Sequence, residues 1–240
     1  MTAARILVPW RDKGDPWRQA NLAVVLTHLS RLDVAPVEVV SDGREGCAPF
    51  NRSAAYNRGA ALCDPGEVMV FHEADMLLPR AQLLDAIALA SEAPGMVVPF
   101  DTYRYLSRDE TIRVRQGADP IASPAEHVMA DGRSNGAVNV LSRATLDAVG
   151  RWDEEFSGWG FDDRAMAHAF HVATGVRTRY VPGPGIHLWH VPGWSESSRF
   201  RGGARIDPAE QVATEINEHR YHRYRDAHTP EKIRALTAGG

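Results

Sequence analysis

The chain has 240 residues, of which 44% are hydrophobic and 24% charged, as is usual for a globular protein built around one core. Its formal net charge of −4 gives no general attraction to nucleic acid or to an anionic membrane, and no apolar run approaches the roughly 20 residues of a membrane span. The N-terminus becomes charged too soon for a signal peptide, and Cys47 and Cys63 are too few for a disulfide framework, so we expect a cytoplasmic protein.

The first 43 residues predict a strand, a helix and a second strand. Residues 6–8 form a short apolar run, and the Asp-Pro pair at 15–16 is typical of a helix start. Residues 37–40 form the second apolar run, so the order is that of a βαβ unit with a parallel sheet. Ligands bind such sheets at the carboxyl ends of the strands, although loop residues there are often only solvated. Three polar residues lie at these ends: Arg11, Lys13 and Asp42.

The next stretch continues the alternation of helices and strands. A helix is predicted from residue 50 to the turn at Asp64, and residues 67–71 form a central strand that runs directly into Glu73 and Asp75. Two acids at a strand end could hold a divalent cation that bridges a diphosphate, but acids in this position are also common in plain turns. A helix at 81–90 and a strand at 96–100 follow, both read from their apolar runs.

Residues 101–133 differ from the rest of the chain. They are polar and charged, with few periodic apolar residues. This composition predicts a long, structureless excursion over the sheet. A connection of this length is usually functional or mobile.

A strand–helix pair precedes two adjacent carboxylates. The apolar run that starts at 136–138 predicts a strand, and residues 143–149 suit a helix closed by a glycine. The glycines on either side of Trp159 let the backbone turn sharply before Asp162 and Asp163. Carboxylates that open a helix are kept ionised by its positive end. An ordinary helix start also favours aspartate, so this alternative stays open.

The C-terminal part contains a pair of histidines. A helix is predicted up to residue 174 and an edge strand at 177–181, after which His187 and His190 can converge on one ion from a turn. With ten histidines in the chain, a chance pair is the alternative. A terminal helix is predicted from Asp207 to about residue 226, with a short helix after it.

Five segments, in this order and spacing, resemble motifs of one enzyme family. Residues 8–13 resemble its Pro-Phe-Arg-Asn-Arg nucleotide loop, and residues 50–59 its Phe-Asn-Arg-Ala and Asn-x-Gly segment. Residues 73–75 stand where the family has Asp-x-Asp. Residues 136–160 run without a gap from a match to Gly-Gly-Val-Ser-Ala-Leu-Ser-Lys to Gly-Trp-Gly. Residues 187–190 stand where the family has Met-x-x-His, half of its metal site.

The family is the β-1,4-galactosyltransferase group of GT-A glycosyltransferases, which is related to chondroitin-polymerase-type and polypeptide N-acetylgalactosaminyltransferase-type enzymes. The resemblance covers about residues 5–195. It implies an α/β fold of the Rossmann-like GT-A kind, with a mixed central sheet flanked by helices. A catalytic domain would cover residues 1–205, and residues 206–240 would form a C-terminal helical extension packed on it.

The resemblance implies a metal-dependent, inverting transfer of a sugar from a UDP-sugar to the hydroxyl of a glycan, protein or lipid-linked acceptor. Asp75, His187 and His190 would hold Mn²⁺ or Mg²⁺, and the nitrogen ligands favour Mn²⁺. Asp163 would be the general base, and Asp162 would hydrogen-bond the acceptor or the base. Trp159 would pack on a sugar ring, unless it is a core tryptophan. Eight residues would bind the donor: Pro9, Arg11, Lys13, Asp42, Phe50, Arg52, Glu73 and Trp159.

The chain also departs from the family pattern. Glu73 replaces the first aspartate of Asp-x-Asp, which leaves Asp75 as the expected direct ligand. The family's Gly-Glu-Asp-Asp becomes residues 161–164, so that an arginine replaces the last acceptor-side carboxylate. The segment between Asp75 and Gly136 is longer than in the galactosyltransferases. These departures leave the acceptor open.

Three other functions are compatible with parts of this pattern. A retaining transferase of the polypeptide N-acetylgalactosaminyltransferase kind shares the acidic strand end and the late histidine. A non-catalytic nucleotide-sugar-binding protein could use the same fold, although it would not need a base at Asp163. A metal hydrolase built on His187 and His190 would normally show a glutamate-bearing helix, which is absent from the sequence pattern.

Overall fold

The computed structural model describes residues 2–46, 48–129, 134–191 and 208–239. Within them the chain forms an α/β structure with two sheets. The expected boundary between residues 205 and 206, the expected helix start at Asp207, and Cys47 lie outside the described residues. None of the described helices is long and apolar enough to cross a membrane.

The first sheet has six strands in the order β2-β1-β3-β8-β5-β9. β1 pairs in parallel with β2 on one side and with β3 on the other, which confirms the predicted βαβ unit. β8 runs antiparallel to both β3 and β5, so the sheet is mixed, as expected. The strands are β1 (Ala4–Pro9), β2 (Val37–Val40), β3 (Val68–His72), β5 (Val97–Val98), β8 (Val138–Leu141) and β9 (Arg179–Tyr180).

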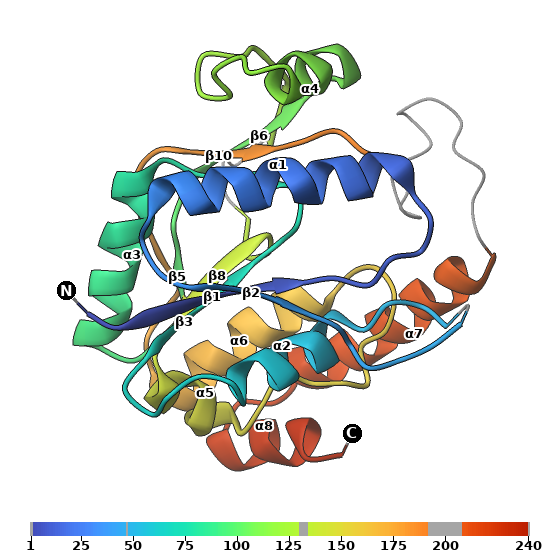
Figure 1. Cartoon of the computed structure of the whole chain (residues 1–240). Helices are drawn as coiled ribbons and strands as arrows, with labels where there is room; N and C mark the ends of the chain where they lie inside the picture. The colour runs from blue at the N-terminus through green and yellow to red at the C-terminus, as the bar shows by residue number, and fades with distance from the viewer. Residues whose placement is uncertain (1, 47, 130–133, 192–207, 240) are drawn as a thin grey trace.

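Helices cover both faces of this sheet (Figure 1). α1 lies over one face, and α2 and α6 lie over the opposite face, with α7 and α8 outermost on that side. Asp15 caps α1 as predicted, and its carboxylate accepts hydrogen bonds from two backbone amides of the first turn. The helices are α1 (Pro16–Leu32), α2 (Arg52–Ala60), α3 (Arg80–Glu92), α5 (Arg143–Val149), α6 (Asp162–Thr174), α7 (Pro208–Arg225) and α8 (Pro230–Thr237).

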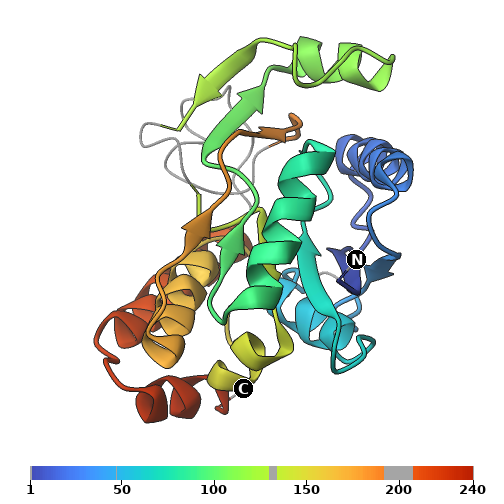
Figure 2. The ribbon, with the colours of Figure 1, turned by 90° about the vertical axis from the view of Figure 1, so that its left-hand side faces the viewer.

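The second sheet has four strands in the order β4-β10-β6-β7. β10 lies at its centre, antiparallel to β4 and parallel to β6. Figure 2 shows β6 and β7 extending with α4 beyond the first sheet. The elements are β4 (Met76–Leu77), β6 (Thr102–Leu106), α4 (Arg108–Arg115), β7 (Ala125–Val128) and β10 (Pro184–His187).

The prediction of a structureless excursion at 101–133 is therefore wrong, because β6, α4 and β7 lie within it. β6 is only half-buried, with Tyr103 and Leu106 facing inward, and its sequence mixes aromatic and charged side chains. α4 is only eight residues long and carries five charged side chains, but Ser107 caps its first turn. Short, half-exposed elements of this kind leave no continuous apolar run for a sequence pattern to detect.

The core fills the space between the first sheet and its helices and continues into the second sheet. β1 and β3 are almost wholly buried, as expected for central strands covered on both faces. An aromatic cluster of Tyr56, Phe71, Trp152 and Phe170 joins α2, β3 and α6. The C-terminal helices pack against α5 and α6. A buried Asp153 ion-paired with Arg220 of α7 fixes them there.

Candidate functional site

A cleft of about 710 Å³ opens where the carboxyl ends of β1 and β3 face the second sheet. Its wall includes the first turn of α1, residues of β6 and β10, and the loop that leads into α6. The cleft gathers twelve of the thirteen predicted site residues: Pro9, Arg11, Lys13, Phe50, Arg52, Glu73, Asp75, Trp159, Asp162, Asp163, His187 and His190. The exception is Asp42, which does not line the cleft.

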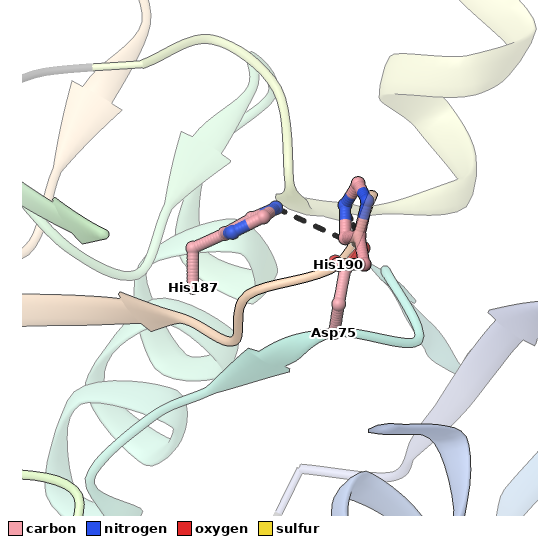
Figure 3. A group of neighbouring side chains, drawn as sticks. All are labelled: Asp75, His187 and His190. Carbon is pink, nitrogen blue, oxygen red and sulfur yellow. Dashed lines mark ion pairs between the residues drawn. The ribbon is translucent and has the colours of Figure 1, made fainter. Parts of the chain in front are cut away.

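Three of these side chains form a cluster of potential metal ligands. The Nε2 atoms of His190 and His187 lie 3.1 Å and 3.8 Å from Oδ2 of Asp75. One ligand atom from each residue lies within 4.8 Å of the other two. Figure 3 shows both imidazoles directed toward the carboxylate. The second carboxylate oxygen, Oδ1, is buried and has no hydrogen-bond partner among the described residues.

Strand pairing brings these ligands together. Asp75 directly precedes β4, and His187 is the last residue of β10, whose antiparallel register sets His187 opposite Met76. The amide of Leu188 then donates to the Asp75 carbonyl at 2.8 Å, which continues the pairing to the ligand itself. The spacing of the two histidines predicts that they converge, and the structure confirms that their side chains lie close together.

Side chains from two other helices hold the segment between the histidines. The amide of Trp189 donates to Oγ1 of Thr111 at 2.8 Å, and its carbonyl accepts from Nδ2 of Asn21 at 3.1 Å. Both Thr111 of α4 and Asn21 of α1 are fully buried. The backbone of Trp189, directly before His190, is therefore held by α4 and by α1.

The Asp75 carboxylate is held in its ionised form. Burial acts to raise its pKa, but His187 and His190 outweigh burial, and the net result is a pKa well below the ordinary range. An ionised carboxylate beside two imidazoles is a donor set suited to a divalent transition metal. The unpartnered Oδ1 atom fits this role, because a buried carboxylate oxygen without a hydrogen bond is costly unless another group satisfies it.

Arg52 joins two of the predicted carboxylates. Its Nε and Nη2 atoms donate to Oδ2 of Asp162 at 2.9 Å and 2.6 Å, and its Nη1 atom contacts the carboxylate of Glu73. Burial acts to lower the pKa of Arg52, but Asp162 and other neighbours outweigh burial and raise it. Asp162 and Glu73 both line the cleft, and each is engaged by the same arginine.

Asp163 lies next to this group but is not bound by Arg52. Its Oδ1 atom accepts from the Arg164 amide at 2.8 Å. Burial and then the charge of Asp162 raise its pKa above the ordinary range, which is the property expected of a carboxylate that must take up a proton. Gly136 packs directly against it, since a Cβ atom there would lie 2.7 Å from Oδ2.

The loop that carries Trp159 is held by helix α7. The hydroxyl of Thr214 donates to the Trp159 carbonyl at 2.9 Å, and Nδ2 of Asn217 donates to the Ser157 carbonyl at 3.0 Å. Gly158 and Gly160 have φ values of 73° and 95°, so the sharp turn predicted there is confirmed. The Trp159 side chain is 46% exposed at the cleft, and the alternative of a core tryptophan is wrong.

The predicted nucleotide residues occupy the other end of the cleft. Arg11 pairs with Asp42 at 3.2 Å and lies 5.8 Å from the centre of the Phe50 ring. Asp42 is only 5% exposed and also accepts a hydrogen bond from the Asn51 amide, so it orients Arg11 from the side that faces away from the cleft. Pro9 ends β1 at the cleft, and Lys13 is exposed there.

Sequence reasoning missed the residues that β6 of the second sheet contributes. Tyr103 and Tyr105 of β6 line the cleft, and their rings lie 5.9 Å and 4.9 Å from the His187 ring. Their spacing of two is the signal of a strand that presents one face, and it could have identified them. Two residues of the α1 start, Asp15 and Arg18, also line the cleft.

The chain was compared with protein-family models and with curated protein sequences. No protein-family model matches the chain. Human chondroitin sulfate N-acetylgalactosaminyltransferase 2 is 28% identical over 153 residues, which cover 59% of this chain and 27% of that protein. The mouse protein of the same name matches to the same extent. The matched region thus spans only about a quarter of the length of these relatives.

Comparison with solved structures gives the fold. A mutant of Drosophila β1,4-galactosyltransferase 7, in complex with manganese, UDP-Gal and xylobiose, has a TM-score of 0.51 at 15% identity, over 89% of this chain and 79% of that chain. GalNAc-T7 with UDP, GalNAc and Mn²⁺ has a TM-score of 0.51 at 14% identity, over 93% of this chain and 50% of that chain.

Proposed function

We propose that this chain, which has the fold of the GT-A glycosyltransferases, transfers a sugar from a UDP-sugar to an acceptor hydroxyl with the help of a divalent cation. The observation that carries this proposal is the cleft, which has the cluster of Asp75, His187 and His190 on one side and the Asp163 carboxylate on the other. A transferase needs both: charge to stabilise the departing diphosphate, and a base for the acceptor.

The donor set supports Mn²⁺, with Mg²⁺ as the alternative, since two nitrogens and one carboxylate suit a borderline metal better than a hard one. When bound, the cation would supply positive charge to the diphosphate. The solved structures of the two transferases described above contain this metal, which supports the assignment. The protein's own part is to keep Asp75 ionised and to orient His187 and His190.

The donor nucleotide would bind at the β1 end of the cleft. Phe50 offers an aromatic face beside the Arg11 guanidinium, and Pro9 and Lys13 complete the wall. We assign Asp42 and Glu73 supporting roles, since the first holds Arg11 and the second holds Arg52. Trp159, exposed at the cleft, would cover the sugar.

Asp163 would act as the general base. The acceptor O–H would give its proton to the Asp163 carboxylate as the oxygen forms its bond to the anomeric carbon, and UDP would leave with the bonding electrons. With the base on the face opposite the leaving group, the acceptor oxygen would attack the anomeric carbon from that face, which inverts its configuration. Chromatography or NMR of the product anomer distinguishes inversion from retention.

We also propose that residues 1–205 and the helices of 206–240 work as one catalytic unit. The contacts of Thr214 and Asn217 with the loop around Trp159 support this arrangement. Glycan, protein and lipid-linked hydroxyls all remain candidates for the acceptor.

The first experiment is a calorimetric titration of UDP into the protein, with Mn²⁺ and then with EDTA. We expect binding that requires the metal, followed by slow hydrolysis of a UDP-sugar; UDP-Gal and UDP-GalNAc are the first donors to screen. Absence of UDP binding under both conditions would refute the proposal. Metal-dependent binding without turnover of any donor, over a broad acceptor screen, would favour a nucleotide-sugar-binding protein.

A further inference from the structure

The cleft contains more positive charge than the predicted site residues supply. Five cationic side chains line its described part: Arg11, Lys13, Arg18, Arg52 and Arg164. Arg11 is paired with Asp42, and Arg52 is shared between Glu73 and Asp162. Their charge is largely neutralised by these partners, so they offer little to an additional anion.

Arg18 is in a different position. Its contact with a described carboxylate is the Asp15 cap, at 3.7 Å, which is beyond hydrogen-bond distance. No described residue accepts a hydrogen bond from its guanidinium, whose side chain is 40% exposed on the cleft wall. A guanidinium whose N–H groups donate to no described residue can bind an anion through two parallel hydrogen bonds.

The backbone that carries Arg18 is fixed. The guanidinium of Arg115 in α4 donates to the Trp17 carbonyl at 2.9 Å and stacks on the Trp17 ring, with 4.4 Å between its central carbon and the ring centre. The Trp17 ring also packs edge-on against Trp189, which lies between the two histidines of the metal cluster. The first turn of α1 and the metal cluster are thus parts of one packed unit.

Arg18 and the metal cluster line the same cleft. The guanidinium and all three residues of the cluster, Asp75, His187 and His190, belong to its wall, so an anion in the cleft can face both. An anion bound between Arg18 and a cation on Asp75 would therefore contact two positive charges. The diphosphate of the proposed donor is the anion that must lie beside that cation.

We infer that Arg18 binds the diphosphate of the donor and shares with the metal the charge that develops on the leaving group. This inference rests on the proposed function. It gives α1 a role in leaving-group stabilisation that none of the sequence motifs contains. Arg18 would hold the phosphate through its open fork, while the nucleoside would bind to the Arg11 and Phe50 side of the cleft.

The test compares Arg18→Gln with Arg31→Gln, a matched control at the far end of the same helix, where the arginine is exposed and away from the cleft. UDP, UMP and uridine are titrated into the wild type and both variants with Mn²⁺, and Mn²⁺ is titrated alone. In Arg18→Gln we expect roughly tenfold weaker UDP binding, the loss typical of one charge-assisted hydrogen bond, with uridine unchanged. Mn²⁺ binding without nucleotide should be unchanged or tighter, because a nearby positive charge has been removed.

Four outcomes overturn the inference. Unchanged UDP affinity in Arg18→Gln would remove Arg18 from the diphosphate site and leave the proposed function intact. Equal losses for UDP and uridine would place Arg18 at the nucleoside or give it only a structural role, and weaker Mn²⁺ binding would also indicate the latter. Failure of the wild type to bind any of the three compounds would refute the proposed function, and the inference with it.

Discussion

The two ends of the cleft are built in different ways. At the metal end, backbone pairing between β4 and β10 sets Asp75 beside His187. At the base end, no sheet sets the position of Asp163, which opens α6 after a glycine-rich loop. Contacts from helix α7, from Phe50 and from Gly136 fix that loop and its carboxylate instead.

This difference separates the part of the cleft in which atomic positions are fixed from the part in which a loop can move. A ladder of backbone hydrogen bonds fixes ligand positions cooperatively, which suits an ion that tolerates little change in distance. Side-chain contacts to a loop can be broken singly, which suits a segment that covers a substrate and then releases it. We expect mutations at the metal end to abolish binding, and mutations at the base end to change turnover while binding persists.

The largest expected effect is at the base. Asp163→Asn should lower kcat by roughly 10²- to 10⁴-fold, the usual contribution of a general base. UDP affinity with Mn²⁺ should stay within about twofold, because Asp163 is outside the metal cluster. Steady-state kinetics and calorimetry measure the two quantities, with Asp85→Asn on the exposed side of α3 as control. Near-normal turnover in Asp163→Asn would move the base elsewhere.

The next effect is at the metal end. Asp75→Ala removes the one carboxylate of the cluster, and we expect Mn²⁺ affinity to fall by at least about 100-fold, more than supporting residues usually cost. UDP binding should lose its dependence on the metal, whereas binding of uridine should persist. Metal-dependent UDP binding that survives in Asp75→Ala would contradict the assignment of the cluster.

The pH dependence of stability sharpens the comparison at the base end. The pKa of Asp163 is raised in the folded chain, so its contribution to stability is complete below the pKa of the unfolded chain and is lost as pH rises through the raised value. Asp163→Asn should therefore have a higher Tm than the wild type at pH 7, and the difference should shrink as the pH falls. Calorimetric melts across pH 3–8 test this, and a difference independent of pH would refute it.

A smaller effect is expected from Gly136→Ala. The added Cβ would lie 2.7 Å from Oδ2 of Asp163, so the carboxylate must move. Displacing the carboxylate of the proposed base lowers the rate of turnover. We expect kcat to fall roughly tenfold with little change in metal affinity. Gly66→Ala, at a turn where a Cβ meets nothing within 4 Å, is the matched control. If Gly136→Ala retained full activity, the close packing of Asp163 would not matter for catalysis.

The smallest effect concerns the anchor of the Trp159 loop. Thr214→Val keeps the shape of the side chain but loses the hydroxyl that donates to the Trp159 carbonyl, whereas Thr214→Ser keeps it. We expect Thr214→Val to lose about 1 kcal/mol of local stability, the usual worth of one hydrogen bond. Hydrogen exchange of the amides at 157–160 should accelerate in Thr214→Val alone. Equal exchange in both variants would show that the hydroxyl does not hold the loop.

The parts of the fold that could be predicted from the sequence are those with local patterns. The βαβ start rests on apolar runs and on the Asp15 cap, and the structure has all of these. The convergence of His187 and His190 follows from their spacing. The contact of His187 with Asp75 needed the register of β10 on β4, which no periodicity in a two-residue strand can give.

The rest depends on contacts between residues far apart in the chain. Arg52 and Asp162 are separated by 110 positions, and Asp42 supports Arg11 from outside the cleft. Thr214 reaches the Trp159 carbonyl across 55 positions. Long-range polar contacts of this kind leave no periodic trace in the sequence, because each residue by itself suits an ordinary solvated surface.

Arg52 has a further consequence for how the protein moves. It begins α2, and its guanidinium ties the end of β3, through Glu73, to the start of α6, through Asp162. Separating the end of β3 from the start of α6 would leave the buried carboxylate of Asp162 and the half-buried carboxylate of Glu73 without their shared counter-charge, which is unfavourable. If the protein is the proposed transferase, we therefore expect the loop of residues 157–160 around Trp159, rather than the end of β3 or the start of α6, to move as substrate enters and product leaves.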